Sequence, residues 1–545
     1  MIKRAVIILA LVGIVALPFM LRPERTAGNK ADATLVIITS HNEAIRHEYG
    51  LGFRQWYKGR TGKDVFIDWR VIGGTSEIAR FLESEYIASF QNLWVRKLGK
   101  PWSANVMAAF ANGRLTADAP AAAQEARRVF LASEVSCGID LFFGGGSYDA
   151  IRQAEAGRLV PSRILQTRPE WFTDEVIPSS YAGEPFRDAE GRWIGNVLSS
   201  YGILCNHDAL KRLGITKTPS QWQDLTDPRY VGEIALADPT KSSSIAKAFE
   251  NLIQQQMQER LTALQAANSG RPAAETEAQA VREGWVRGLQ IIQLICANSR
   301  YFTDSSQKPP IDVAQGNSAV GICIDFYGRY QAEAVRRRDD SARLEFVTPH
   351  GGTVSSVDPI GLLRGAPHRE VAEDFIEYTL TMDGQKLWNF KVGAPGGPVR
   401  FSLRRVPIRR DFYARKEWTD LRSDPEADPY DVAEHLVYRP AWTGDIFREM
   451  AFIIRVMAMD TQPELVRAWR AMAAAGSPPA ALAVMGDMDA VTYEKVLGNI
   501  KQALNAKNKV EEIRLANALG ASFREQYRRA EEIARSATAR ANAQR

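Results

Sequence analysis

Three glycines and a serine, residues 144–147, directly follow an apolar run in the stretch DLFFGGGSYDAI. A glycine-lined strand end that leads into a helix presents backbone N–H groups, which suit an oxyanion or a carboxylate. Nucleotide hydrolysis is not indicated, because no Gly-Lys-[Ser/Thr] follows at the spacing of a phosphate-binding loop. The stretch therefore predicts a site for a polar or anionic group, with Gly145, Gly146 and Ser147 as candidate residues.

Two earlier strand ends carry small polar residues of the same kind. Ser40, His41, Asn42 and Glu43 follow a strand predicted at 34–39, and a second strand, predicted at 64–71, ends before Gly74 and Thr75. Either turn could simply cap the helix after it, with Ser40 or Asn42 accepting backbone N–H bonds. In an open α/β sheet, however, ligands bind in the crevice at the carboxyl ends of the strands. We therefore expect these residues to share one site with the glycine loop.

A second apolar series begins with GNVLSSYGILCN at residues 195–206 and supplies a matching set of strand ends. Polar residues leave the strand-like runs of this series at four places, and the serine run among them could also be a flexible turn. The candidates are Ser200 and Tyr201, then Thr240, Ser242 and Ser243, then Asp325 and Tyr327, and finally Asp358.

Specific enzyme chemistry finds no support in the sequence. There is no Gly-x-Ser-x-Gly elbow and no His-Glu-x-x-His pair, and the 545 residues include only six histidines. The four cysteines form no Cys-x-x-Cys pair, so zinc and thioredoxin-like sites are not indicated, although Cys205 and Cys323 lie in strand-like runs that could be neighbours. A net charge of +5 is too small to predict a nucleic-acid partner. The sequence therefore favours a binding protein over an enzyme.

The elements that position these residues alternate between strands and helices. Strand, helix and strand at the spacing of residues 34–71 predict a right-handed crossover in a parallel sheet. Alanine-rich helical stretches at about 86–132 and 248–285 interrupt the series as insertions. After about residue 400 the chain reads as helical, and a last helix from about 510 places Ile513, Ala516, Leu519, Phe523 and Tyr527 on one side.

The N-terminus has the pattern of an export signal. Lys3 and Arg4 precede an apolar stretch at 5–21, which is a positive region followed by a hydrophobic one. The stretch is near the lower length limit for crossing a bilayer, so it could be cleaved or remain as a membrane anchor. We therefore expect residues 1–30 to be a signal peptide or an N-terminal anchor.

Several longer phrases resemble the extracellular solute-binding proteins of ABC importers, in the branch that includes the ferric-ion-binding proteins. The most specific is W-x-D-L-x-D-P-x-Y-x-G-E-I-A-x-x-D-P at residues 222–239. The glycine-loop stretch, VAQGNSAVGICIDFY and DPIGLLRGAPHREVAEDFIEYTLTMDGQKLW occur around it in the family's usual order. The resemblance covers about residues 33–400, and the region after it has no counterpart.

The resemblance implies an α/β protein with the type II periplasmic-binding-protein fold, in which two lobes close at a hinge on a ligand between them. The protein would be periplasmic or otherwise extracytoplasmic, monomeric, attached to the membrane only through its N-terminal segment, and a partner of an ABC permease and ATPase complex. The chain would cross between lobes near 197–201 and 346–354. The expected parts are lobe I at 33–195, lobe II at 196–349, a return to lobe I at 350–400, and a helical C-terminal extension at 401–545.

The identity of the solute stays open at this point. In the ferric-binding members, a histidine and adjacent tyrosines hold iron, and His41, Glu43, Asp325 and Tyr327 form a conceivable set for Fe(III) as cargo. Phe326 stands where one of the two tyrosines would be, which weakens that alternative. The many Ser, Thr and Gly residues favour a small polar or anionic solute and no cofactor, whereas Asp325 and Glu43 would also suit a cationic amine. A ligand-sensing subunit of a signalling system would have the same fold.

Overall fold

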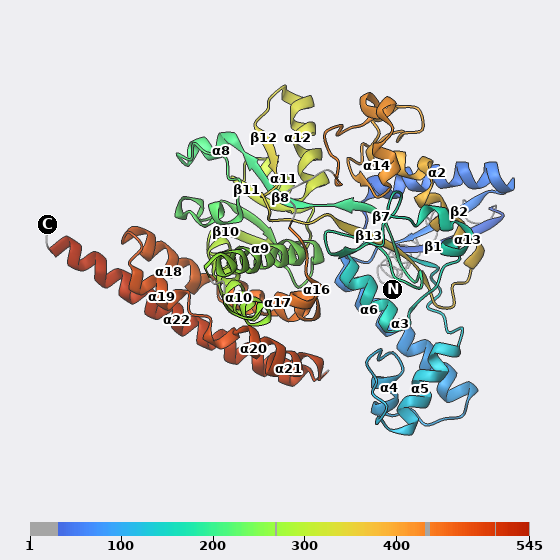
Figure 1. Ribbon diagram of the computed structural model, residues 1–545, viewed down its shortest axis with the longest axis horizontal. Helices are drawn as coiled ribbons and strands as arrows, with labels where there is room; N and C mark the ends of the chain where they lie inside the picture. The colour runs from blue at the N-terminus through green and yellow to red at the C-terminus, as the bar shows by residue number, and fades with distance from the viewer. Residues whose placement is uncertain (1–30, 268–269, 431–435, 507, 544–545) are drawn as a thin grey trace, which may run out of the picture.

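The computed structural model describes residues 31–267, 270–430, 436–506 and 508–543, which form two α/β lobes side by side (Figure 1). Lobe I, with the N-terminal strands, lies at the right of the view, and lobe II lies to its left. The export-signal prediction for residues 1–30 falls outside the described residues. Within the part of the chain that is described, no helix is both long enough and apolar enough to cross a membrane.

The sheet of lobe I has the order β14-β7-β13-β3-β1-β2, and β4 pairs with β13. Strand β1 runs parallel to β2 and β3, whereas β13 is antiparallel to both of its neighbours β3 and β7. The strands are β1 (Ala33–Thr39), β2 (Val65–Arg70), β3 (Leu141–Phe143), β4 (Leu159–Val160), β7 (Ile194–Ser199), β13 (Ser356–Leu363) and β14 (Val406–Pro407).

The sheet of lobe II has the order β10-β9-β11-β8-β12. Strand β9 runs parallel to β10 and β11, and β8 is antiparallel to both of its neighbours β11 and β12. The strands are β8 (Tyr201–Asn206), β9 (Ile234–Ala237), β10 (Ser299–Thr303), β11 (Val320–Ile324) and β12 (Leu344–Val347).

The two sheets therefore repeat one plan, which is that of the type II periplasmic-binding-protein fold. In each sheet the single antiparallel strand of the core is the one that the chain reaches by crossing from the other lobe: β8 follows β7 across Ser200, and β13 follows β12. The two crossing segments are joined, because the backbone N–H of Tyr201 donates to Oγ1 of Thr353 over 3.0 Å. The predicted fold class is confirmed.

Helices cover both faces of the sheets and carry the cleft residues at their N-termini. In lobe I these are α2 (Glu43–Thr61), α3 (Thr75–Gln91), α6 (Ser147–Glu155), α7 (Ile164–Thr167), α13 (Arg369–Leu380) and α14 (Met382–Asn389). In lobe II they are α8 (His207–Arg212), α9 (Ser243–Ala267), α10 (Ala273–Ala297), α11 (Lys308–Ala314) and α12 (Asp325–Asp339).

Both predicted insertions are helical. After α3, the chain continues through η1 (Asn92–Lys97), α4 (Ala104–Ala109) and α5 (Ala121–Ala132), which project at the lower right of Figure 1. The second insertion corresponds to the long antiparallel pair α9 and α10, which connects β9 to β10. Met257 and Gly284 lie at the contact between these two helices, where a Cβ on the glycine would come within 2.4 Å of the Met257 backbone.

The region after Arg400 differs from the predicted helical extension in its first part. Strand β14 and the short α15 (Arg410–Tyr413) belong to lobe I, where β14 adds to the edge of the sheet beside β7. Helices dominate only from Pro440 onward: α16 (Pro440–Thr443), α17 (Phe447–Ile454), α18 (Gln462–Ala474), α19 (Pro479–Met485), α20 (Tyr493–Lys495), α21 (Lys501–Asn505) and α22 (Lys509–Ala543). Proline and the short apolar repeat of 406–408 explain why the edge strand is only two residues long.

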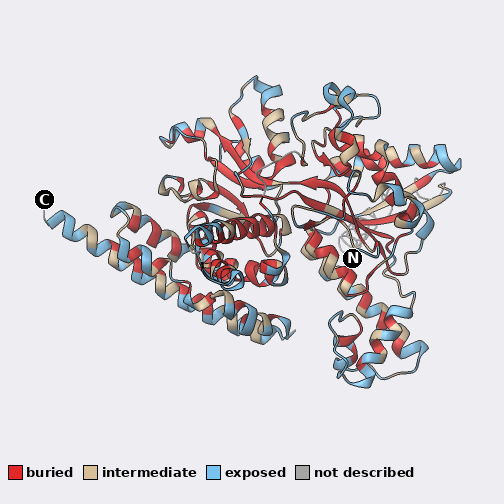
Figure 2. Cartoon of the chain, viewed as in Figure 1, coloured by how far each residue is buried: buried red, intermediate tan, exposed pale blue. Residues whose placement is uncertain are grey.

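The C-terminal helices pack against lobe II, on the left of Figure 1, and share its core. Trp285 of α10, Met450 of α17 and Tyr527 of α22 are fully buried in one apolar cluster with the strands of lobe II. Figure 2 shows buried residues continuing from the sheet through α9 and α10 to the inner side of these helices. On α22, Leu519, Phe523 and Tyr527 are buried as the sequence predicts, but Ile513 is 50% exposed because its turn of the helix extends past the core.

The four cysteines are free, and three of them are buried. Strands β8 and β11 are neighbours, but Cys205 lies opposite Val320 and Cys323 lies opposite Gly202. The offset separates the two thiols along the strands, so the sulfur atoms do not face each other.

Candidate functional site

A cavity of about 990 Å³ lies between the lobes, at the carboxyl ends of β1, β2 and β3 of lobe I and of β9, β10 and β11 of lobe II. All but three of the residues predicted from the sequence line it. From lobe I these are Ser40, His41, Asn42, Glu43, Gly74, Thr75, Gly145, Gly146, Ser147 and Asp358; from lobe II they are Tyr201, Ser242, Ser243 and Tyr327.

Ser200, Thr240 and Asp325 do not line the cavity. The carbonyl of Ser200 accepts the backbone N–H of Asp325 over 3.0 Å, and Thr240 turns its hydroxyl to Oδ1 of Asp238 at 2.7 Å. Asp325 is buried, pairs with Arg329 one helical turn later, and accepts the backbone N–H of Phe326. These three predictions were wrong because the side chains satisfy partners within lobe II.

Three helices begin at the cavity wall: α3 and α6 from lobe I and α9 from lobe II. The predicted caps Thr75 and Ser147 are instead the first helical residues, and glycines Gly74 and Gly146 occupy the N-cap positions without a side-chain cap bond. The first-turn N–H groups of a helix have no partner within the helix, and they carry its positive partial charge. With no capping side chain over them, these amides of α3 and α6 are available to an anion.

At α2 the bland alternative holds as well. The side chain of Asn42 caps the helix by accepting the backbone N–H of Ile45 over 3.0 Å. The hydroxyl of Thr39 likewise accepts the N–H of His41. Asn42 still lines the cavity, so its amide group serves both the helix and the wall.

A fully buried arginine that the sequence analysis missed, Arg405, balances the charge at one end of the cavity. Its guanidinium donates to Oδ2 of Asp358 over 2.6 Å and to the hydroxyl of Ser199, and lies 4.4 Å from the centre of the Phe326 ring. The charge of Asp358 is therefore compensated by the protein itself. A ligand cation is not needed there, which removes one argument for a cationic amine.

His41 stays neutral beside this pair. Its Nδ1 lies 3.9 Å from Oδ2 of Asp358. Burial lowers the pKa of His41 to about 3, and although Asp358 raises it, the nearby charges of Arg405 and Arg46 lower it further. The side chain therefore contributes an uncharged ring to the wall at neutral pH.

The proposed iron ligands are not brought together. Asp325 points away from the cavity, and Glu43 is exposed at the first turn of α2. Burial raises the pKa of Tyr327, which disfavours the phenolate form. Among the described residues, no group of three or more histidine, cysteine, aspartate or glutamate side chains is placed to hold a metal ion.

Two cations line the cavity without a carboxylate partner within 4 Å in the described part of the chain. Arg46 comes from α2 of lobe I, and Lys241 comes from the turn before α9 of lobe II. The lobes approach closely here, because a Cβ on Gly74 would lie 3.0 Å from the carbonyl oxygen of Lys241. Positive charge without internal compensation therefore lies next to the N-terminus of α3.

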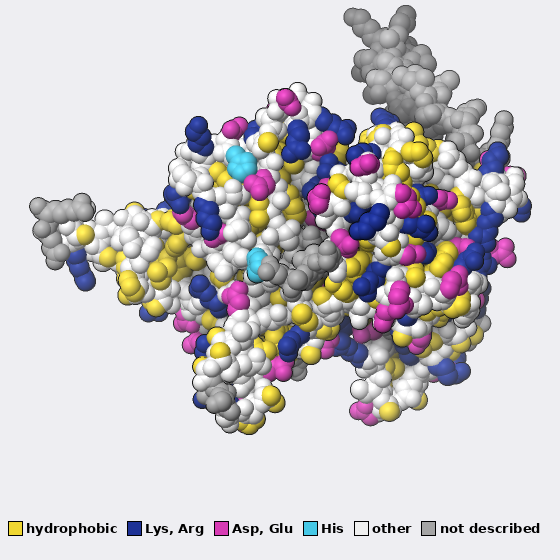
Figure 3. Space-filling view, turned by 45° about the horizontal axis from the view of Figure 1, so that its top comes forward, with side chains coloured by type: hydrophobic (Ala, Val, Ile, Leu, Met, Phe, Trp, Pro, Cys, Tyr) yellow, Lys and Arg dark blue, Asp and Glu magenta, His cyan; other side chains and the backbone are white. Residues whose placement is uncertain are grey.

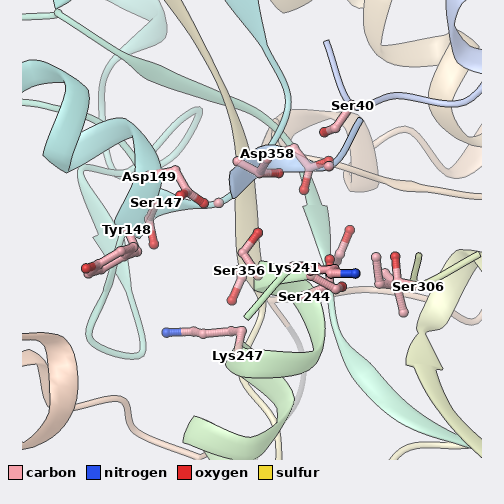
Figure 4. Close-up of a pocket in the computed structure, with 18 of the residues that line it drawn as sticks. Ser40, Ser147, Tyr148, Asp149, Lys241, Ser244, Lys247, Ser306, Ser356 and Asp358 are labelled. Atoms are coloured by element: carbon pink, nitrogen blue, oxygen red, sulfur yellow. The ribbon is translucent and has the colours of Figure 1, made fainter. Parts of the chain in front are cut away.

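The opposite end of the cavity carries a buried charge cluster that joins the lobes. Lys247 of α9 pairs with Glu184 of lobe I and with Glu250, whose carboxylate is 2.9 Å away. Burial opposes the charged form of Lys247, but the two carboxylates more than offset this and raise its pKa. Figure 4 shows Lys247 on the same side of the cavity as Tyr148, and Ser306 across from them.

Asp149, on the first turn of α6, is the one cavity carboxyl group whose charge is set near neutral pH. Burial raises the pKa of Asp149 to about 7, although hydrogen bonds from Ser243 and from the N–H of Gly146 lower it. Oδ2 of Asp149 has no hydrogen-bond partner. Near neutral pH this wall therefore switches between an uncharged donor and a negative acceptor.

The sequence analysis missed several wall residues for different reasons. Ser305, Ser306 and Gln307 follow β10 as small polar residues after a strand, which is the signal that found the other strand ends. Arg405 is one of five arginines in RFSLRRVPIRR and carries no local signal. Tyr438, Pro440, Gly444, Asp445 and Phe447 line the cavity from beyond the region of resemblance.

Comparison with known proteins identifies the family of the central part of the chain. Residues 138–401 match the family model described as bacterial extracellular solute-binding protein. A protein of Haemophilus influenzae described as uncharacterized is 25% identical over 252 residues, which are 46% of this chain and 60% of that protein. The phosphoglycerate transport regulatory protein PgtC of Salmonella typhimurium is 23% identical over 192 residues, which are 35% of this chain and 39% of PgtC. The matches thus span less than two thirds of these relatives.

Solved structures with a similar arrangement include periplasmic binding proteins. AfuA from Actinobacillus pleuropneumoniae, solved with fructose-6-phosphate bound, is 18% identical, with a TM-score of 0.48 over 81% of this chain and 98% of AfuA. Iron-bound HitA from Pseudomonas aeruginosa is 15% identical, with a TM-score of 0.44 over 77% of this chain and 99% of HitA.

The family consists of extracytoplasmic binding proteins rather than enzymes, and its members bind small solutes and work with the permease and ATPase of ABC importers. Its description gives no support to the signalling alternative. Residues 138–401 belong to the bacterial extracellular solute-binding proteins, and the chain around them has the two-lobed type II periplasmic-binding fold.

Proposed function

We propose that this protein is the solute-capturing subunit of an ABC importer and that its cargo is a small organic anion with a phosphate or carboxylate group. One observation carries the choice of an anion: the N-termini of α3, α6 and α9 meet at one cavity beside Arg46 and Lys241. Helix N-termini and cations without internal partners favour negative charge.

The size of the cavity supports an organic solute rather than a bare ion. A volume of about 990 Å³ is at the upper end of small-molecule sites, which measure roughly 300–1,000 Å³. The wall offers neutral donors in addition to charges, among them the hydroxyls of Ser40, Ser147, Ser244 and Ser356, which Figure 4 shows around the cavity. Such groups suit the hydroxyl or carbonyl oxygens of a polar solute.

Fe(III) is the second candidate that the sequence raised. The geometry favours it less, because Asp325 lies outside the cavity, Glu43 is exposed, and Arg405 already compensates Asp358. A monomeric state, delivery to a permease and export through residues 1–30 complete the proposal.

The test is isothermal titration calorimetry of the ligand-free protein with a panel of solutes. The panel contains 3-phosphoglycerate, fructose 6-phosphate, citrate, inorganic phosphate, putrescine and ferric citrate. At least one organic anion should bind with 1:1 stoichiometry, and at a hundred times Kd it should stabilise the fold by about 2.7 kcal/mol. Binding of putrescine alone, or of iron equally with and without citrate, would refute the anion proposal.

Variants locate the binding site for the anion. A charged hydrogen bond is worth about 1.5–3 kcal/mol, so Arg46→Gln or Lys241→Gln should weaken binding by roughly tenfold or more. Lys63→Gln is the matched control, because Lys63 is an exposed lobe I cation that does not line the cavity. Equal affinity of all three variants would place the anion elsewhere.

A further inference from the structure

Residues 436–447, here called the strap, cross from one lobe to the other along the side of the cavity. The strap lies after the part of the chain that matches the family. Five of its residues line the cavity: Tyr438, Pro440, Gly444, Asp445 and Phe447. A solute-binding site that is open along this side in a protein without these residues is therefore walled in this one.

On lobe II the strap is fixed by buried hydrogen bonds to α9 and α10. The amide group of Gln254 accepts the N–H of Arg439 over 2.9 Å and donates to its carbonyl over 3.0 Å. Glu250 accepts the hydroxyl of Tyr438 at 3.0 Å, and Glu277 accepts the indole N–H of Trp442 at 2.8 Å. These contacts make the strap a firm part of lobe II.

On lobe I the strap makes three separate contacts. The N–H of Tyr438 donates to the carbonyl of Ala182 over 2.8 Å, in the hairpin of β5 (Ser180–Tyr181) and β6 (Glu184–Pro185). The rings of Phe447 and Tyr148 pack with centroids 4.6 Å apart. Asp445 pairs with Arg114 of the first insertion at 2.6 Å.

The aromatic groups of this wall are engaged with the protein rather than open to a ligand. Phe447 covers the Tyr148 ring, with the Arg152 guanidinium 5.4 Å from its centroid. The ammonium of Lys247 lies 3.5 Å from the centre of the Tyr438 ring. Beside the strap, the buried Lys247–Glu184 ion pair makes a further link between the lobes. The side chains at this end therefore join the lobes to each other.

The other end of the cavity lacks such a bridge in the described residues. There the wall is formed by Val71, Ile72 and Gly73 after β2 and by Asp304 after β10, all of which are exposed. In Figure 4, Ser306 marks the β10 side of the cavity, across from Tyr148 and Lys247. A solute would reach the helix N-termini from this side.

We propose that the strap holds the two lobes closed at one end, so that the binding cavity is preformed and the solute enters through the opening between the β2 and β10 loops. Wide opening of both lobes about the crossing segments, which is the usual motion of such hinges, would break every lobe I contact of the strap. The meaning of the cavity as a solute site rests on the proposed function, but the fastening of the lobes does not.

The test is the distance distribution between spin labels on the two lobes, measured in ligand-free protein. Labels at Lys63→Cys and Lys217→Cys, in a Cys137→Ser background, occupy exposed positions away from the cavity. The unmodified strap should give one narrow population. The double variant Tyr148→Ala/Asp445→Ala, which removes a ring pair and an ion pair on the lobe I side, should increase a longer-distance population about tenfold.

Glu494→Ala is the matched control, since Glu494 is an exposed carboxylate like Asp445 but pairs with Arg282 within the lobe II side. It should leave the distribution unchanged. Two comparable populations in the unmodified protein, or a double variant with native circular dichroism and an unchanged distribution, would overturn the proposal. Because the measurement uses no ligand, a failure of anion binding in calorimetry leaves it intact, and the reverse also holds.

Discussion

Replacement of Lys247 by methionine tests whether the buried charges between the lobes are as tightly balanced as the structure indicates. Lys247, Glu184 and Glu250 are 8%, 0% and 1% exposed. Methionine keeps most of the side-chain volume and removes the charge, so two buried carboxylates remain without their cation. Breaking a buried pair by removing one partner costs about 3–5 kcal/mol. That is a large fraction of a typical unfolding free energy of about 5–15 kcal/mol.

The assay is urea unfolding followed by fluorescence, with Lys58→Met as the control. Lys58 and Asp64 form an ion pair that is about 60% exposed on both sides, and such pairs contribute at most about 1 kcal/mol. The double variant Lys247→Met/Glu184→Gln should recover part of the loss, because it removes one of the two uncompensated charges. Glu250 keeps the hydroxyls of Tyr438 and Thr443 as donors.

The pH dependence of the same variant gives a second, independent reading. Burial raises the pKa of Glu184 even beside Lys247, and loss of the ammonium group would raise it further. Between the unfolded pKa, near 4.3, and the raised folded pKa, the folded state binds more protons, so stability falls as pH rises. The deficit of Lys247→Met should therefore shrink as pH is lowered from 7.5 toward 5. Equal losses for Lys247→Met and Lys58→Met, or a deficit that does not change with pH, would refute the reasoning.

Two other predictions use the titration and burial of single groups. Because burial raises the pKa of Asp149 to about 7, its ionisation should weaken binding of a fully ionised anion such as citrate as pH rises from 6 to 8; Asp149→Asn should flatten this profile in calorimetry, and an unchanged slope would remove Asp149 from the site. Burial raises the pKa of the thiols of Cys205, Cys296 and Cys323, so a thiol reagent should modify at most Cys137 in the native protein and all four cysteines after unfolding; rapid modification of a second thiol would contradict the described packing.

The strand ends could be predicted from the sequence because their signal is local. The run of Thr34 to Thr39 with small polar residues behind it specifies a buried parallel strand and its carboxyl end, and the structure has β1 at Ala33–Thr39. Helix caps were harder, because Thr75 and Ser147 follow glycines that adopt the extended N-cap conformation themselves. Exchange of one residue at a helix start moves the hydroxyl from the cap into the first turn.

The charge balance of the cavity could not be predicted, since it depends on contacts between distant segments. Asp358 reads as a free carboxylate until Arg405 is placed beneath it from another part of the chain. Asp325 reads as a cleft residue until Arg329 is found one turn along the same helix. Periodicity specifies which face of an element is buried, but it does not specify which side chain from another element meets that face.

On the surface, basic and acidic side chains are interspersed over the face that Figure 3 presents, in keeping with a net charge of +5. Specific attraction of an anion therefore depends on the cleft rather than on a broad positive field. The local arrangement of Arg46, Lys241 and the helix ends is what distinguishes this part of the molecule from its exterior.

The burial of α10 between the sheet of lobe II and the C-terminal helices has a consequence for how the protein can be divided. The indole N–H of Trp285 donates to the carbonyl of Val491, and the amide of Gln293 donates to the hydroxyl of Tyr527. A shortened protein that stops before α17 would expose a broad apolar stripe of α10 and leave these polar groups without partners in a formerly dry interior. Such a fragment should aggregate rather than fold, so the family-matching portion of this chain is not a unit that can be expressed alone.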